Sequence, residues 1–185
     1  RGAHAIMAVA SVGGIRGHQP GELVLPHQLI DYTHERQHTF FDGGELKVVH
    51  VDFTHPYTPA LRASCVAAAQ QASIVLTDGG VYAAVQGPRL ETAAEIDRLD
   101  RDGATMVGMT GMPEAGLARE LELPYASICV IVNHAAGRGD SAQAISMEAL
   151  VRTLEAGMDK VRLLLDHLVP MVPVAPVPTA LERAQ

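Results

Sequence analysis

The sequence is poor in cysteine, in basic residues and in long apolar runs, and each shortage excludes a class of protein. Its two cysteines, Cys65 and Cys129, lie far apart in apolar surroundings without a CxxC pair, which excludes a disulfide framework and predicts reduced thiols in a cytoplasmic protein. Lys and Arg number 14 against 21 Asp and Glu, and no window concentrates them, so nucleic-acid and membrane partners are not expected. No apolar run approaches the roughly 18 residues of a membrane-spanning helix.

The remaining composition indicates one domain. A chain of 185 residues, 48% of them hydrophobic, is long enough for a single α/β domain with a filled core. Prolines recur every few residues after position 169 and branched apolar residues are scarce there, so we expect a domain over residues 1–169 and a Pro-rich flexible tail over residues 170–185. A buried-strand pattern begins almost at Arg1, which predicts that N-terminal strands of the sheet precede this residue and are missing here.

Strand and helix patterns alternate along the chain. Strands are predicted at Ala5–Ala10 (ending at Gly13-Gly14), Leu23–Leu25, Lys47–Val51, Ile74–Leu76, Val81–Val85, Thr105–Met109 and Ala126–Val132. Helices are predicted from Thr58 to Ser73, Glu91 to Asp102, Met112 to Glu122 and Ser141 to Leu168. This order indicates an α/β fold with a mixed, mostly parallel twisted sheet flanked by helices, in which ligands bind at the carboxyl ends of strands.

A metal site and a serine hydrolase are poorly supported. His34 and His38 have the i, i+4 spacing of a helical ligand pair, but Arg36 lies between them and would oppose a cation. No third ligand is convincingly placed, so surface histidines are the simpler interpretation. The chain also has no G-x-S-x-G motif for a nucleophilic serine.

Three predicted strand ends carry polar side chains: Glu91, Thr110 and Asn133. Two of them also have a plain structural interpretation, since a carboxylate such as Glu91 at the first turn complements a helix dipole and a threonine such as Thr110 suits a helix N-cap. Because the fold class directs strand ends toward one crevice, we expect the three side chains to face a common site.

Five segments together resemble a known family. They are Ser11-Val12-Gly13-Gly14-Ile15, Pro20-Gly21-Glu22-Leu23-Val24, Ile30-Asp31-Tyr32-Thr33, Gly87-Pro88-Arg89-Leu90-Glu91-Thr92 and Gly108-Met109-Thr110-Gly111-Met112-Pro113-Glu114. In this order, over residues 5–168, they resemble the trimeric purine nucleoside phosphorylase and methylthioadenosine phosphorylase family.

The resemblance implies phosphorolysis, in which phosphate attacks the ribosyl C1′ while the purine leaves. It places phosphate on the backbone N–H of Ser11 and the hydroxyl of Thr110, and it places Met109 beneath the ribose. It assigns Glu91 and Asn133 to catalysis at the base. It implies neither a metal ion nor an organic cofactor, and inorganic phosphate is the co-substrate.

Further contacts with the nucleoside are implied by the same resemblance. The base site includes Leu90, His134 and Ala135. At the position of Leu90, relatives carry a phenylalanine. The 5′ pocket is formed by Met147 and Leu150, with equal odds that these two only pack in the core, and by His50 of a neighbouring subunit in a homotrimer. Where relatives have a polar residue, this chain has Ala10.

Hydrogen-bond chemistry favours a 6-oxopurine. Ionised Glu91 only accepts and so pairs with the N1–H of hypoxanthine, while the Asn133 amide donates to O6 or N7. Adenine-specific relatives have aspartates at the positions of Asn133 and Ala135. Together with the resemblance, which implies an apolar 5′ pocket of Met147 and Leu150, this leads us to expect phosphorolysis of S-methyl-5′-thioinosine to hypoxanthine and S-methyl-5-thioribose 1-phosphate in purine and methionine salvage.

Two alternatives stay open at this point. One is an inosine/guanosine phosphorylase, because His50 suits a 5′-hydroxyl. The other is a catalytically silent ligand-binding or subunit-interaction fragment. The family's Gly-rich phosphate loop and Arg-His segment precede the position that corresponds to Arg1, so this alternative expects the given chain to be inactive by itself.

Overall fold

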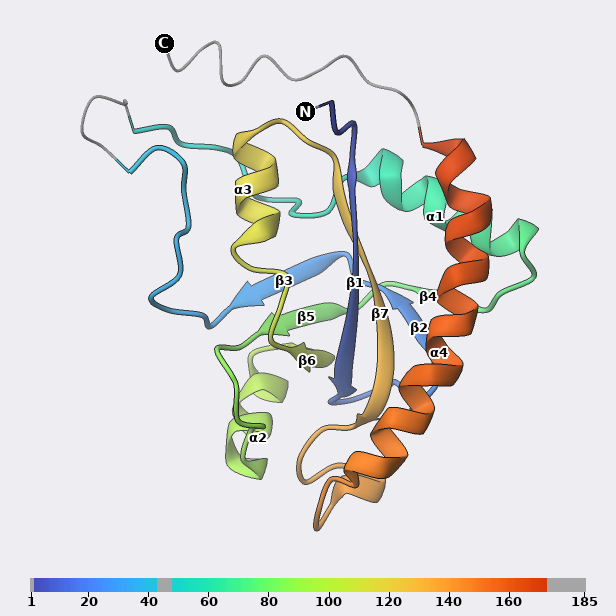
Figure 1. Ribbon diagram of the computed structural model, residues 1–185. Coiled ribbons are helices and arrows are strands. Elements are labelled where there is room, and N and C mark those ends of the chain that lie inside the picture. The colour runs from blue at the N-terminus through green and yellow to red at the C-terminus, as the bar shows by residue number, and fades with distance from the viewer. Residues whose placement is uncertain (1, 43–47, 173–185) are drawn as a thin grey trace.

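The computed structural model describes residues 2–42 and 48–172, which form one seven-stranded sheet with helices on both faces (Figure 1). The strands are β1 (Ile6–Gly14), β2 (Leu23–Leu25), β3 (Gln28–Asp31), β4 (Leu76–Asp78), β5 (Val81–Ala84), β6 (Met106–Gly108) and β7 (Tyr125–His134). The helices are α1 (Pro59–Gln71), α2 (Ala93–Arg101), α3 (Glu114–Glu120) and α4 (Met147–Leu168), with 3-10 turns at Gly139–Ser141 and Val169–Met171.

The sheet is mixed and mostly parallel, as predicted. Its strand order is β3-β5-β6-β1-β7-β2-β4. The pairs β3/β5, β5/β6, β1/β7 and β2/β4 are parallel, whereas β1/β6 and β2/β7 are antiparallel. The long strands β1 and β7 therefore run together through the middle of the sheet, opposite in direction to all the others (Figure 1).

Alternating side chains of the sheet build a core on each face. Ile128 and Val130 of β7 pack with α1 and α4, while Cys129 and Ile131 pack with α3 on the opposite face. Helix α2 packs against Ala83 and other small side chains of β5 and β6, on the same face as α1 and α4. The continuous burial of β7 from its first residue to Val132 explains why its sequence is almost entirely apolar.

Several element predictions were wrong in detail. A strand was predicted at Lys47–Val51, but Val48–Val51 has no regular structure and is exposed, while Lys47 lies outside the described residues. The β-branched residues there have no neighbouring strand to pair with, and such propensity forms a strand only in a sheet. Strand β3 was missed.

The last helix begins later than predicted, and the end of the chain is only partly described. Helix α4 begins at Met147, because the side chain of Ser146 caps it by accepting a hydrogen bond from the Ala149 N–H at 3.3 Å. The predicted tail lies outside the described residues from position 173 onward. Within the described part, no helix has the length and apolar character needed to cross a membrane.

Candidate functional site

A cavity of about 310 Å³ opens where β1 and β6 separate. These strands pair only through Gly13 with Val107 and Gly14 with Met106. Along the rest of β1 no strand of the described residues pairs with the edge that faces away from β7. The cavity lies against this free edge, and the segment that leaves β6 forms its other side.

Most of the predicted site residues line this cavity. Those that do are Ser11, Leu90, Glu91, Met109, Thr110, Asn133, Ala135 and Leu150; the remaining lining residues are Val9, Ala10, Val12, Gly13, Val107, Gly108, Val132 and Ile145. The expectation that three strand ends meet at one site is confirmed, but the physical reason differs from the one predicted. Strand β6 runs antiparallel to β1 and β7, so the site lies between diverging strands and not along a common carboxyl edge.

Glu91 reaches the cavity because the helix behind it is capped by other residues. Thr92 is the N-cap of α2, and its side chain accepts a hydrogen bond from the Glu95 N–H while the Glu95 carboxylate accepts one from the Thr92 N–H. The dipole interpretation of Glu91 is therefore not needed. Burial raises the pKa of the Glu91 carboxyl, because its ionised form loses hydration there.

Thr110 is held in place by a buried tyrosine that the sequence interpretation did not single out. The N–H of Thr110 donates to the Tyr82 hydroxyl at 3.2 Å, and the two hydroxyl oxygens are also 3.2 Å apart. Thr110 is not a helix N-cap, since α3 begins four residues later at Glu114. Burial raises the pKa of Tyr82 to about 12, so this hydroxyl keeps its proton at neutral pH.

A β-bulge sets the position of Asn133. In the pairing of β1 with β7, Val12 lies opposite Ile131 and Gly13 opposite Asn133, so Val132 has no partner. Both Val132 and Asn133 line the cavity, which is the effect expected when an extra residue turns a strand. One hydrogen of the Asn133 amide nitrogen goes to the His134 carbonyl at 2.5 Å, and the second remains for a ligand.

Three predicted site residues lie elsewhere. The His134 ring turns to Asp140, with 2.6 Å between Nδ1 and the carboxylate, and packs over Gly139. Met147 is 60% exposed at the first turn of α4, so it neither lines the cavity nor fills the core. His50 is exposed in the segment without regular structure, and its predicted role across a subunit interface stays a prediction.

Arg36 joins the two segments that carry Glu91 and Thr110. Its guanidinium donates to the backbone carbonyls of Val85, Gln86, Met109 and Met112. The first two carbonyls belong to the segment after β5 and the last two to the segment after β6. The sequence interpretation used this arginine only as an argument against a metal, because nothing in the sequence reveals bonds to carbonyls.

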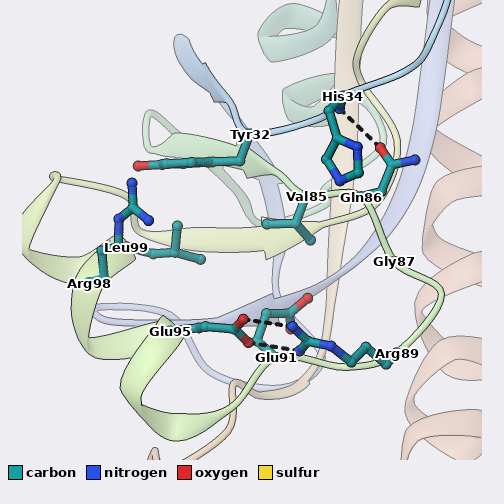
Figure 2. Close-up of a pocket in the computed structure, with 10 residues that line it drawn as sticks. All are labelled: Tyr32, His34, Val85, Gln86, Gly87, Arg89, Glu91, Glu95, Arg98 and Leu99. Carbon is teal, nitrogen blue, oxygen red and sulfur yellow. Dashed lines mark hydrogen bonds and ion pairs between the residues drawn. The ribbon is translucent and has the colours of Figure 1, made fainter.

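A second cavity of about 380 Å³ lies on the other side of Glu91 and is drawn in Figure 2. The Arg89 guanidinium and the Glu95 carboxylate form two hydrogen bonds of 2.7 and 2.8 Å at its wall. Arg98 lies over the Tyr32 ring, 5.6 Å from its centroid. These charged groups already have partners within the chain, so we take the cavity between β1 and β6 as the candidate site.

Within the described residues, no group of three or more His, Cys, Asp or Glu side chains is arranged to hold a metal ion. The imidazole of His38, the second of the two spaced histidines, lies 3.9 Å from the Asp31 carboxylate.

Comparison with known proteins decides the family. The sequence model described as "Phosphorylase superfamily" matches residues 1–170. This chain belongs to the phosphorylase superfamily. Two similar superfamily members are the probable S-methyl-5′-thioinosine phosphorylases of Pseudomonas syringae pv. tomato, 53% identical over 87% of this chain, and of Xanthomonas campestris pv. campestris, 50% identical over 84%. A probable 6-oxopurine nucleoside phosphorylase of Thermococcus kodakarensis is 39% identical over 93% of it.

Solved structures share the phosphorylase fold. A methylthioadenosine phosphorylase from an antarctic soil metagenomic library is 29% identical, with a TM-score of 0.87 over 99% of this chain. This chain covers 66% of that structure, and 65% and 62% of the Pseudomonas and Xanthomonas sequences. It thus spans just under two thirds of the length of those two relatives.

Proposed function

We propose that this protein catalyses the phosphorolysis of S-methyl-5′-thioinosine. An oxygen of inorganic phosphate forms a bond to C1′ of the ribose, the bond from C1′ to N9 breaks, and its electron pair passes into the purine. The products are hypoxanthine and S-methyl-5-thioribose 1-phosphate. The Pseudomonas and Xanthomonas relatives, each at least half identical over the matched residues, carry the name of this activity, which supports the proposal. We further propose that this reaction serves purine and methionine salvage and takes place in the cytoplasm.

The observation that carries the proposal is the meeting of Glu91 and Asn133 on one cavity, with Ala135 beside them. A carboxylate that accepts and an amide hydrogen that donates complement the N1–H and O6 of a 6-oxopurine. Adenine presents the reverse pattern at these two atoms. Ala135 offers no polar group to a 6-amino substituent, so adenine would leave a buried polar atom unpaired, at a cost of roughly 1–3 kcal/mol.

The free edge of β1 and the segment after β6 suit the phosphate and the ribose. Ser11 and Thr110 face each other across the cavity from these two sides, with Met109 beside them. We propose that the Ser11 N–H and the Thr110 hydroxyl donate to phosphate and that the Met109 thioether packs beneath the sugar. The Met109 side chain is fixed by Gly87, where a Cβ atom would come within 2.5 Å of its sulfur.

The apolar side chains of Leu150 and Ile145 favour a methylthio group at the 5′ end. An inosine or guanosine phosphorylase is the second candidate, because the Thermococcus relative is named a probable 6-oxopurine nucleoside phosphorylase. We further propose a homotrimer in which His50 of one subunit reaches the 5′ end of the substrate in the next. Exposed Val48 and Val49, which precede His50 in the sequence, give this segment an apolar surface for such a contact.

Initial rates test the proposal directly. The protein expressed from its complete reading frame is assayed spectrophotometrically with S-methyl-5′-thioinosine, inosine and methylthioadenosine, each with and without phosphate. We expect phosphate-dependent cleavage with the highest kcat/KM for the first substrate. A preference for methylthioadenosine would contradict the base assignment, and a preference for inosine would favour the second candidate.

A further inference from the structure

Tyr82 connects the core of the sheet to the cavity without lining it. Its side chain is 1% exposed, and its hydroxyl contacts both the N–H and the Oγ1 of Thr110 at 3.2 Å. A Cβ atom at Gly108 would collide with this hydroxyl, and one at Gly111 would lie 3.3 Å from the Tyr82 ring. Two glycines thus leave the space through which the ring reaches Thr110.

The hydrogen atoms of this pair can be assigned by counting. The Tyr82 oxygen accepts the Thr110 N–H. The other hydrogen bond of the Tyr82 hydroxyl among the described residues joins it to Oγ1 of Thr110, so the single hydrogen of this buried hydroxyl is paired there if Tyr82 donates. When Tyr82 donates to that oxygen, the hydrogen of the Thr110 hydroxyl is left to point outward. Thr110 is exposed at the cavity, so this hydrogen is available to an anion there.

We propose that Tyr82 is a positioning residue that orients the Thr110 hydroxyl as a hydrogen-bond donor to phosphate. The inference rests on the function proposed above and concerns the phosphate end of the same site. Tyr82 touches neither substrate. The Tyr82 oxygen fixes the backbone of Thr110 by accepting its N–H. The Tyr82 hydroxyl donates to Oγ1 of Thr110, so the hydrogen of the Thr110 hydroxyl points away from Tyr82 and toward the cavity.

The test compares two buried tyrosines. Tyr82→Phe removes the hydroxyl and keeps the ring, and Tyr57→Phe is the matched control, because Tyr57 is 2% exposed in the same apolar cluster and its hydroxyl has no hydrogen-bond partner among the described residues. We expect Tyr82→Phe to raise the KM for phosphate about 3- to 10-fold, the effect of one hydrogen bond. The KM for the nucleoside should change by less than about two-fold in both variants.

A double-mutant cycle separates positioning from general packing. In a Thr110→Val background the added Tyr82→Phe substitution should change the dissociation constant of phosphate by less than about two-fold, because the residue through which Tyr82 acts is gone. An equal additional loss in that background would overturn the inference. So would a Tyr82→Phe enzyme whose KM for phosphate matches that of Tyr57→Phe.

Failure of the proposed function has a different signature. A wild-type protein without phosphate-dependent cleavage overturns both proposals, whereas an active wild type with an unaffected Tyr82→Phe variant overturns only the second. If Tyr82→Phe does not fold, 3-fluorotyrosine at position 82 keeps the hydroxyl and gives one fluorine resonance. That resonance should shift on titration with inorganic phosphate, and an unchanged resonance at saturating phosphate overturns the inference.

Discussion

Replacing Glu91 by glutamine should stabilise the protein and weaken its activity on 6-oxopurine nucleosides. Burial raises the pKa of the Glu91 carboxyl, so folding disfavours the charged form of this side chain. At neutral pH the carboxyl is ionised in the unfolded chain, and the free energy of unfolding is therefore reduced. A neutral amide of the same shape removes this penalty. The gain from Glu91→Gln should disappear as the pH falls below the ordinary carboxyl range, where the wild-type side chain is also neutral.

The effect on activity has the opposite sign. Glutamine can still accept a hydrogen bond from N1–H, but without the negative charge. A bond to a charged acceptor contributes roughly 1.5–3 kcal/mol against about 1 kcal/mol for a neutral one. Because Glu91 is only half-buried and solvent screens its charge, we take the lower end of this difference, a loss of about 0.5 kcal/mol or about two-fold in kcat/KM.

The neighbouring Glu95 provides the matched control. Its carboxylate is exposed, and its hydrogen bonds from Arg89 and from the Thr92 N–H hold its pKa at about 2. For a lowered pKa the sign reverses: Glu95→Gln should lower the unfolding temperature at neutral pH, and the deficit should vanish as the pH falls from 4.5 toward 2. Its kcat/KM for S-methyl-5′-thioinosine should stay near that of the wild type.

Thermal unfolding between pH 2 and pH 8 and kcat/KM at pH 7, both measured for all three proteins, check the stability and the activity halves of the argument. A Glu91→Gln protein that melts below the wild type at pH 7 would refute the argument from burial. An unchanged kcat/KM would refute its role as acceptor for N1–H.

Three further outcomes are expected. Arg36→Ala should lower the free energy of unfolding by about 3 kcal/mol in urea titrations, because four backbone carbonyls lose a charged donor. Arg36→Lys should recover little of this free energy, since a lysine ammonium lacks the planar array of donors of a guanidinium. Gly157→Ala in α4 should destabilise by about 1–3 kcal/mol, because its Cβ would collide with Val130. The control Gly116→Ala in α3, which meets only a methionine methyl at 3.6 Å, should be neutral or stabilising. Asn133→Asp should raise the ratio of kcat/KM for methylthioadenosine to that for S-methyl-5′-thioinosine, and an unchanged ratio would remove Asn133 from base recognition.

The parts of the fold that follow from local pattern were predictable. Helix α1 has proline at its first position and small apolar residues at helical spacing, and the buried run of β7 is apolar except for Ser127. The segment Val48–Val51 has the composition of a strand and forms none, because pairing depends on a partner that only the tertiary structure supplies. Strand β3 was missed because three of its four residues are half-buried, the fourth is exposed, and the four show no alternation.

The candidate site shows a similar division. Glu91, Thr110 and Asn133 could be found because each polar side chain follows a glycine or an apolar strand. Tyr82 and Arg36 could not, since a tyrosine in a strand and an arginine in a loop have no pattern that reveals their partners. Their roles depend on distances between segments that lie far apart in the sequence.

If Asn133 recognises the base as proposed, the unpaired Val132 makes this recognition depend on chain length as well as on residue type. A homologue that lacks one residue at this point would keep Gly13 opposite the asparagine and an unbroken hydrogen-bond ladder. By the alternation of a strand, however, the amide would then turn to the face covered by α4. A single gap at this position in a sequence alignment is therefore compatible with a stable sheet and incompatible with the same nucleobase preference.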